Sequence, residues 1–454
     1  MKNSGIILME SAPVPQAIVR LALPMIVAMT AQAIYNMTDM FFIGQTGNAN
    51  MVAAVSLVFP VFMLSQAIAN VFAVGSSSYI SRLLGNKNAE EAKNTSAVSF
   101  HLAMATGVVL TILLWFLRNP VLSLIGSSEG TFGHAEAYFS IVLISIPFAT
   151  VNTVFSSLMR SEGATSRAMT LQLIGIILNI IFDPLLISAA GWGIKGAAWA
   201  TIIGQSASFC YGVWYFRGGK TTLSVRIKNA KANSAMLREV LSIGIPAGIS
   251  GALMSAVNIL SNRIAAGYGD HVVAGSGVTM RIASLCFMLV FALTMGYQPF
   301  AGFNYGAKNF TRLKKGFYFT LVFSSALCVT GCLVFFIFGN ALVRFFINDE
   351  NTIEIGAAML RVFIIGLLFL GVQATFMTTF QALGKSLAAM LVTLGRQLLF
   401  YVPLLYTLNS LFGFTGFILV MPLADICTTA LALALSRPLF RIMGEKRYAA
   451  PVFH

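Results

Sequence analysis

Charged side chains are scarce in this sequence. They make up 10% of its 454 residues, whereas hydrophobic residues make up 57%; soluble domains carry about 25% charged residues. No soluble fold of this size has enough interior to bury so much apolar side chain, so the composition excludes a soluble protein. A bilayer provides the space, because each helix that crosses it uses about 20 apolar residues. We therefore expect an all-α integral membrane protein.

The sequence also lacks the residue patterns of enzymes. It contains no GxxxxGK[ST] nucleotide-binding loop and no His, Cys and carboxylate cluster with metal-site spacing. Its five cysteines all fall in apolar runs, and Cys328 and Cys332 form the one close pair. Because no His or third thiol is near that pair in the sequence, we interpret the cysteines as packing residues. We expect no enzyme, no resident cofactor and no disulfide framework.

Twelve hydrophobic segments are long enough to cross a bilayer. The second and eighth are longer than a bilayer requires. The apolar run at 6–9 is too short for a signal-peptide core, so we expect the first span to direct insertion. The predicted spans are 18–43, 52–82, 95–117, 136–159, 168–190, 194–216, 239–266, 273–303, 312–338, 356–382, 387–408 and 414–436.

The sequence has a net charge of +14, and its Lys and Arg residues are unevenly distributed along the chain. Twenty-two of the 29 Lys and Arg residues fall in loops or ends on one side of the predicted bilayer. Cytoplasmic loops retain positive charge, so we expect both termini in the cytoplasm, and an even number of spans agrees. The charge therefore does not require a nucleic-acid partner.

The chain repeats itself at a separation of about 221 residues. Pro24 matches Pro246, and the loop 85–93 (GNKNAEEAK) matches the loop 306–314 (GAKNFTRLK). Six spans per half is even, so both copies insert the same way up, as parallel repeats related about an axis along the membrane normal. We predict an N-lobe over 1–216, a basic cytoplasmic linker over 217–236 and a C-lobe over 237–454.

Two acidic residues inside the predicted spans stand out by their neighbours. A charge in the bilayer core costs roughly 2.5–3.5 kcal/mol on insertion scales. Asn179 stands one turn before Asp183, and at 1.5 Å per residue Asp39, Asp183 and Thr201 lie at a similar depth. Such oxygen groups suit Na⁺, or a proton on one of two neighbouring buried carboxylates. We predict a coupling-ion site at Asp39, Asn179, Asp183 and Thr201; the alternative is that these side chains only join helices.

The second half does not repeat this set. Ser261 stands opposite Asp39, and Val402 or Pro403 stands opposite Asp183. We therefore expect ion coupling in the N-lobe alone.

A third acid, Asp425, lies in the middle of a predicted span of the second half. Arg396 and Arg281 are basic residues that also lie within spans. We interpret Asp425 as half of a structural ion pair with one of these arginines.

Several stretches of the chain together resemble the multidrug and toxic compound extrusion (MATE) family over essentially the whole length. Asp39 with Asn179 and Asp183 resembles the branch of the DNA-damage-inducible (DinF-like) exporters and the staphylococcal multidrug exporter. There the resemblance implies a coupling cation or proton on these residues, with Thr201 at the fourth ligand position. The stretches are Pro24, 36–39 (NMTD), 85–88 (GNKN), 160–167 (RSEGATSR), 179–184 (NIIFDP) and 299–306 (PFAGFNYG).

The resemblance implies twelve transmembrane helices in two six-helix pseudo-symmetric lobes, the MATE/MOP-type fold. It implies a secondary active multidrug exporter that antiports lipophilic, cationic drugs against H⁺ or Na⁺ by alternating access of the lobes. We expect a monomer in a bacterial inner membrane. Our candidates for polar contacts with the substrate are Gln32, Tyr35, Asn36 and Asn152, each of which fits a helix-joining role equally well.

The main alternative is a flippase for lipid-linked oligosaccharides of the same superfamily. Such proteins usually need a basic central cavity for a pyrophosphate. Only three basic residues, Arg281, Arg361 and Arg396, lie inside the predicted spans away from their ends, which favours cation export.

Overall fold

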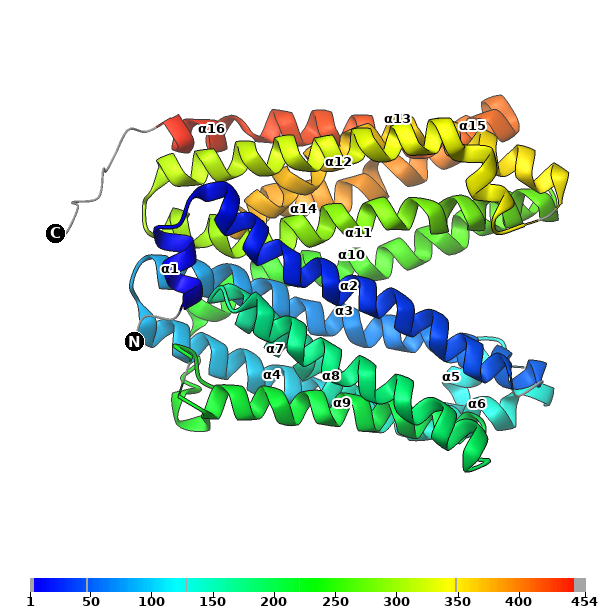
Figure 1. Ribbon diagram of the computed structural model, residues 1–454, viewed down its shortest axis with the longest axis horizontal. Coiled ribbons are helices and arrows are strands. Elements are labelled where there is room, and N and C mark those ends of the chain that lie inside the picture. The colour runs from blue at the N-terminus through cyan, green and yellow to red at the C-terminus, as the bar shows by residue number, and fades with distance from the viewer. Residues whose placement is uncertain (1–3, 46–47, 128, 220, 348, 445–454) are drawn as a thin grey trace. The chain divides into compact units, whose positions relative to one another are not determined.

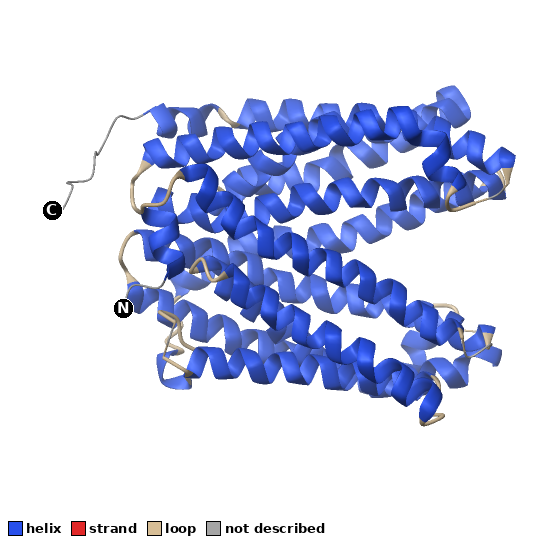
Figure 2. Cartoon of the chain, in the orientation of Figure 1, coloured by secondary structure: helices blue, strands red, loops and turns tan. Residues whose placement is uncertain are grey.

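The computed structural model describes residues 4–45, 48–127, 129–219, 221–347 and 349–444. Over these ranges the chain is almost entirely helical and contains no β-strand (Figure 2). The predicted all-α fold class is confirmed.

Long helices connected by short loops make up both halves of the chain (Figure 1). Those of the first half are α1 (Ser4–Glu10), α2 (Val14–Gly44), α3 (Ala49–Gly85), α4 (Ala89–Phe116), α5 (Arg118–Leu124), α6 (Glu129–Val142), η1 (Leu143–Ser145), α7 (Ile146–Ser161), α8 (Thr165–Pro184), η2 (Leu185–Ala189), α9 (Ile194–Arg217) and η3 (Ile227–Asn229). Those of the second half are α10 (Ser234–Ala266), α11 (Asp270–Gly306), α12 (Phe310–Arg344), α13 (Glu350–Ala382), α14 (Ser386–Leu394), η4 (Gly395–Tyr401), α15 (Val402–Leu435) and α16 (Arg437–Gly444).

Ten helical stretches among the described residues are long and apolar enough to cross a membrane. The last of them, Ser386–Leu435, holds two predicted spans, because Gly413 (φ 57°, ψ −134°) interrupts the helical backbone inside α15. The 24-residue helix α9 lies where the sixth span was predicted. The described helices therefore account for all twelve predicted spans, and the second and eighth, α3 and α11, are indeed long, at 37 residues each.

The predicted repeat is visible in the backbone. Gly193, just before α9, has φ 52° and ψ −131°, nearly the conformation of Gly413 at the matching position. Lys87 and Lys308 both have positive φ, 61° and 56°, which is uncommon for a residue other than glycine. The helices that follow these lysines, α4 and α12, are both capped by an asparagine side chain. Matched sequence thus produces matched local structure.

The contacts divide the chain into two compact units. Unit 1 comprises Met1–Met9 and Val27–Gly248, and unit 2 comprises Glu10–Ile26 and Ile249–His454. Helices α2 and α10 each pass from one unit to the other two residues after an internal proline, Pro24 or Pro246. Proline removes a backbone hydrogen bond inside a helix, so each helix has a weakened turn near its change of unit.

The segment predicted as a linker, 217–236, belongs to unit 1. The Ser96 hydroxyl donates to the backbone oxygen of Ser224 (2.8 Å), and Thr221 and Thr222 donate to the buried carboxyl group of Glu162. This segment is therefore fixed to the helices of unit 1. The lobe boundaries deduced from the repeat stay a prediction.

Candidate functional site: an oxygen cluster in unit 1

Helices α8 and α9 approach each other closely at two glycines. A Cβ atom on Gly204 would lie 2.6 Å from the backbone oxygen of Gly175, a distance that no side chain tolerates. Gly204 also lies beside the Cβ of Asn179. Since Asn179 and Thr201 each stand one turn from these glycines, the close approach brings their side chains together.

Asn179 connects the two helices through both ends of its amide group. When the amide is oriented to satisfy both ends, Nδ2 donates to Asp183 Oδ2 (2.8 Å) and Oδ1 accepts from the backbone N–H of Thr201 (3.1 Å). Asn179 and Asp183 are both buried. The amide therefore fixes the Asp183 carboxyl group next to α9.

Helix α2 adds two more side chains to this cluster. The carboxyl group of Asp39 lies beside that of Asp183, and the hydroxyl of Tyr35 lies close to the side chain of Thr201. Two carboxylates so close repel each other unless a proton or a cation lies between them. The cluster can therefore bind and release positive charge.

The other oxygen of Asp183 supports this chemistry. Asp183 is fully buried, and its Oδ1 accepts no hydrogen bond from a donor in the described part of the chain. Buried polar atoms without a partner are rare and call for an explanation. An oxygen-rich set with one unsatisfied carboxyl oxygen fits a proton or a hard cation.

The residues predicted to contact substrate fall into three different environments. Gln32 and Asn36 are exposed, and Gln32 Nε2 donates to Asn36 Oδ1 (3.1 Å). Asn152 is buried on α7, and its Nδ2 donates to the backbone oxygen and to Oε1 of Gln205 on α9, both at 2.9 Å. Tyr35 belongs to the oxygen cluster. Of the four predicted substrate contacts, Gln32 and Asn36 are therefore the two that are exposed.

Sequence reasoning assigned Tyr35 to the substrate and overlooked Tyr138. Tyr138 on α6 is buried within electrostatic range of Asp39, Tyr35 and Asp183. The spacing of Tyr35, one turn before Asp39, was a signal for membership of the cluster. Nothing in the sequence near Tyr138 indicates that it lies close to Asp39, because the two residues are about 100 positions apart along the chain.

Unit 2 has neutral groups at the matching position. Ser261, opposite Asp39 in the repeat, shares a 2.9 Å hydrogen bond with the hydroxyl of Tyr401. Tyr401 lies next to Val402, which stands opposite Asp183. A hydroxyl pair has no carboxylate to take up a proton or a cation.

The charged groups of unit 2 pair with each other elsewhere. Arg396 Nε donates to Asp425 Oδ1 at 2.6 Å, and Gln373 Nε2 donates to the backbone oxygen of Asp425 at 2.7 Å. Asp425 is buried. The interpretation of Asp425 as half of an ion pair is confirmed, and its partner is Arg396.

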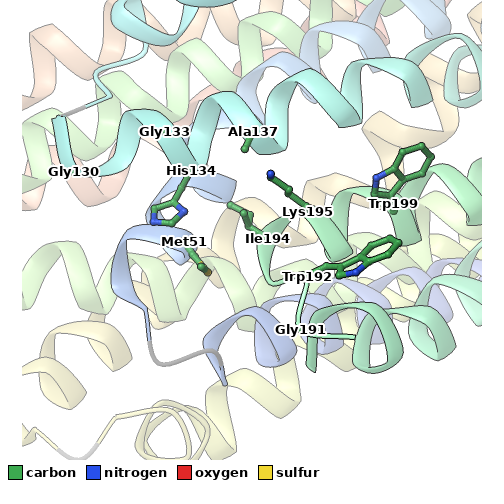
Figure 3. Close-up of a pocket in the computed structure, with 10 residues that line it drawn as sticks. All are labelled: Met51, Gly130, Gly133, His134, Ala137, Gly191, Trp192, Ile194, Lys195 and Trp199. Carbon is green, nitrogen blue, oxygen red and sulfur yellow. The ribbon is translucent and has the colours of Figure 1, made fainter. Parts of the chain in front are cut away.

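A separate pocket of about 850 Å³ lies beside the start of α9 (Figure 3). His134 and Lys195 point into it, and Trp192 and Trp199 stand together at one side. None of the predicted site residues lines it. Its one permanently charged lining group, Lys195, is a cation, so this pocket does not suit a positively charged ligand.

Comparisons with known proteins agree with this architecture. The sequence model of the MatE family matches residues 24–185 and, a second time, residues 246–407. The multidrug export protein MepA of Staphylococcus aureus strain MSSA476 is 30% identical over 431 residues, 95% of each chain. MepA of Staphylococcus haemolyticus strain JCSC1435 is 28% identical over 433 residues, again 95% of each.

Solved structures share the fold. An outward-facing multidrug resistance MATE family transporter of the MOP superfamily superposes with a TM-score of 0.90 at 23% identity, covering 98% of this chain and 99% of that one. A MOP superfamily transporter from Pyrococcus furiosus, described as having a binding pocket of reverse polarity, gives 0.90 at 24% identity, covering 98% and 100%. The two-lobe fold expected from the resemblance is therefore confirmed. With the family model matched in both halves, this chain belongs to the MatE family of membrane transporters.

Proposed function

We propose that this protein is a secondary active multidrug exporter, which moves lipophilic, cationic drugs out of the cell in exchange for H⁺ or Na⁺. The two lobes would alternate in access, and the coupling ion would bind at Asp39, Asn179, Asp183 and Thr201. We further propose that the protein acts as a monomer in a bacterial inner membrane with both termini in the cytoplasm. The relatives with the same length and arrangement are multidrug export proteins, which supports the substrate class.

The observation that carries the coupling role is the contact between the carboxyl groups of Asp39 and Asp183. Asp39 comes from α2 and Asp183 from α8, so positive charge between them holds the two helices together. Its release leaves two carboxylates that repel each other. Binding and release of the ion can thereby bias the position of α2, the helix that changes unit beyond Pro24.

The amide orientation of Asn179 supports a proton more than Na⁺ as the coupling ion. In the orientation that satisfies both ends of the amide, its nitrogen is directed at Asp183, whereas Na⁺ would be bound by the oxygen. A direct contact between two carboxyl groups needs just one proton. We therefore expect H⁺ to be the coupling ion, with Na⁺ as the tested alternative.

The test is ethidium efflux from a drug-sensitive bacterium that lacks its own exporters. We expect Asp39→Asn and Asp183→Asn each to lower the efflux rate by at least about tenfold, a loss of roughly 1.4 kcal/mol or more. Ser261→Ala, at the position of unit 2 that matches Asp39, is the control and should leave the rate unchanged at equal protein level. Undiminished efflux in both Asp variants would contradict the coupling role.

The same cells separate the two ions. A protonophore should stop efflux by the wild-type protein, and replacement of Na⁺ by K⁺ should not. The opposite pattern would assign Na⁺ to the site and contradict our preference for H⁺.

A further inference from the structure

A second pocket, of about 430 Å³, lies within unit 2 where α2 and α12 begin. Pro13 lines it just before α2. Val14 and Pro15 line it from the first turn of α2, and Thr311, Arg312, Lys315 and Phe319 line it from α12. Two of the lining residues are cationic and none is acidic. The pocket therefore combines positive charge with apolar side chains, which suits an anionic ligand.

Arg312 is fixed in place beside the pocket. Its Nη2 donates to the backbone oxygen of Ala12 (2.8 Å), and its guanidinium group stacks on the ring of Phe300 at 5.4 Å. The backbone N–H of Arg312 is held by the capping side chain of Asn309. A guanidinium held in this way adds positive charge beside the pocket from a fixed position.

Lys315 supplies the second charge. It is exposed, lies almost one turn beyond Arg312, and its ammonium group has no ion pair or hydrogen bond among the residues that the structure describes. Its neighbour Lys314 is equally exposed but does not line the pocket. The two lysines therefore differ in position and not in charge.

The surface beside the pocket continues into the hydrophobic face of α12. Tyr318 and Val322 are 43% and 67% exposed, and with Phe319 they follow Lys315 at helical spacing. In a membrane-spanning helix such an exposed apolar face contacts lipid chains. The arrangement of two cations above a lipid-facing strip matches an anionic headgroup above its acyl chains.

Unit 1 shows that this feature is not a by-product of the repeat. Thr311 and Arg312 correspond to Glu90 and Glu91, and Lys315 corresponds to Asn94. Glu91 accepts hydrogen bonds from Tyr79 and Asn88. The matching surface of unit 1 therefore carries acids and would repel the anion that unit 2 attracts.

From these observations we propose that the pocket formed by the starts of α2 and α12 binds the phosphate group of an anionic phospholipid. The shared chemistry is a phosphate anion, and the lipid is favoured over free phosphate because the pocket opens beside a lipid-facing helix. Bound lipid would contact both Pro13–Pro15 and α12, and so stabilise the attachment of the first part of α2 to unit 2. The inference does not depend on the identity of the drug or of the coupling ion.

The test uses the full-length protein purified in detergent and stripped of lipid. Native mass spectrometry measures the apparent affinity for dioleoyl phosphatidylglycerol, with dioleoyl phosphatidylcholine as the neutral reference. We expect Lys315→Gln to weaken binding of the anionic lipid about fivefold, the effect of one basic residue near an anionic lipid. Lys314→Gln removes the same charge one residue away and should leave this affinity unchanged.

Two further measurements sharpen the result. If the Arg312→Gln variant folds, it should weaken lipid binding at least as much as Lys315→Gln does. If the Arg312→Gln variant does not fold, Lys315→Gln alone tests the proposal. Excess inorganic phosphate should fail to displace the lipid. Equal weakening by Lys314→Gln and Lys315→Gln, equal affinity for both lipids, or displacement by phosphate would each overturn the assignment.

Discussion

Where unit 1 brings two carboxyl groups together, unit 2 brings together two hydroxyl groups. Asp39 and Asp183 are in contact in unit 1, and Ser261 and Tyr401 share a neutral hydrogen bond in the matching region of unit 2. The backbones remain alike, as Gly193 and Gly413 show by their nearly identical dihedral angles. The comparison teaches that duplication preserved the helical scaffold while the polar interior diverged. The proposed ion site therefore belongs to unit 1 alone, and unit 2 has neutral groups at the matching position.

The largest expected effect on stability comes from breaking the ion pair of Arg396 and Asp425 in unit 2. Asp425→Asn should destabilise the protein by about 3–5 kcal/mol, because it leaves the buried guanidinium of Arg396 without its carboxylate. The measurement is the thermal unfolding of the purified protein, together with its yield. The double variant Arg396→Met with Asp425→Leu should recover most of the stability and should keep drug efflux. A stable double variant that has lost efflux would show that unit 2 also takes part in coupling.

In unit 1, a glycine allows the backbones of α8 and α9 to approach closely, whereas the matching position of unit 2 is an alanine. Gly204→Ala should cost about 1–3 kcal/mol and reduce efflux, because the new methyl group would overlap the backbone of Gly175. The repeat places Ala424 at the matching position of unit 2. Ala424→Gly should cost only about 1 kcal/mol, the usual price of glycine in a helix, and leave efflux intact. Similar melting temperatures and efflux rates for the two variants would contradict this difference.

Removal of one hydroxyl group in each unit tests the comparison more finely. Tyr35→Phe and Tyr401→Phe should each cost about 1 kcal/mol, since each removes a hydroxyl group that has a polar neighbour, Thr201 or Ser261. Only Tyr35→Phe should also slow ethidium efflux, because its hydroxyl belongs to the oxygen cluster. An equal slowing by Tyr401→Phe would show that the ion site does not explain the asymmetry.

The smallest expected effect concerns Glu162, which the repeat matches with the apolar Leu383. Burial raises the pKa of the Glu162 carboxyl above its ordinary value of 4.5, against hydrogen bonds from Tyr215, Thr221 and Thr222 that favour the carboxylate. The folded state therefore binds the proton more tightly than the unfolded state does. Its contribution to stability is fully present below pH 4.5 and is lost as the pH rises through the folded-state pKa.

Glu162→Gln should remove this part of the pH dependence. The measurement is the melting temperature of wild type and variant at a series of pH values, and the advantage of the wild type should shrink as the pH rises. Leu383→Gln in unit 2 alters stability by burying an amide, and its difference from wild type should not follow pH in this range. A wild-type advantage that grows with pH would contradict the direction of the shift.

Much of the ion site could be predicted from the sequence, because a carboxylate inside an apolar span is costly and therefore conspicuous. Asp39, Asn179, Asp183 and Thr201 were identified by type, spacing and depth, and the structure brings them together. Whether they bind an ion remains the proposal to be tested.

Side chains that are cheap to place inside a membrane span are not conspicuous in the sequence, so it did not predict their neighbours. In the sequence, Cys328 has one close thiol, Cys332, but helix packing adds Cys286 to the same apolar cluster, where its thiol donates to the backbone oxygen of Leu327. Among the described residues, no group of three or more His, Cys, Asp or Glu side chains is placed to hold a metal ion. The sequence did not reveal Cys286 as a neighbour of the other two, and their role as packing residues stays an interpretation.

The sequence by itself determined the membrane class, the twelve spans, the repeat and the acids of the first half. These features depend on hydropathy, charge and periodicity, which are properties of the chain and not of its folding. Only the tertiary structure decided that Arg396 and not Arg281 pairs with Asp425, that Tyr35 joins the oxygen cluster, and that the start of α2 belongs to unit 2. These outcomes depend on which helices pack together, and distance along the chain carries no information about that.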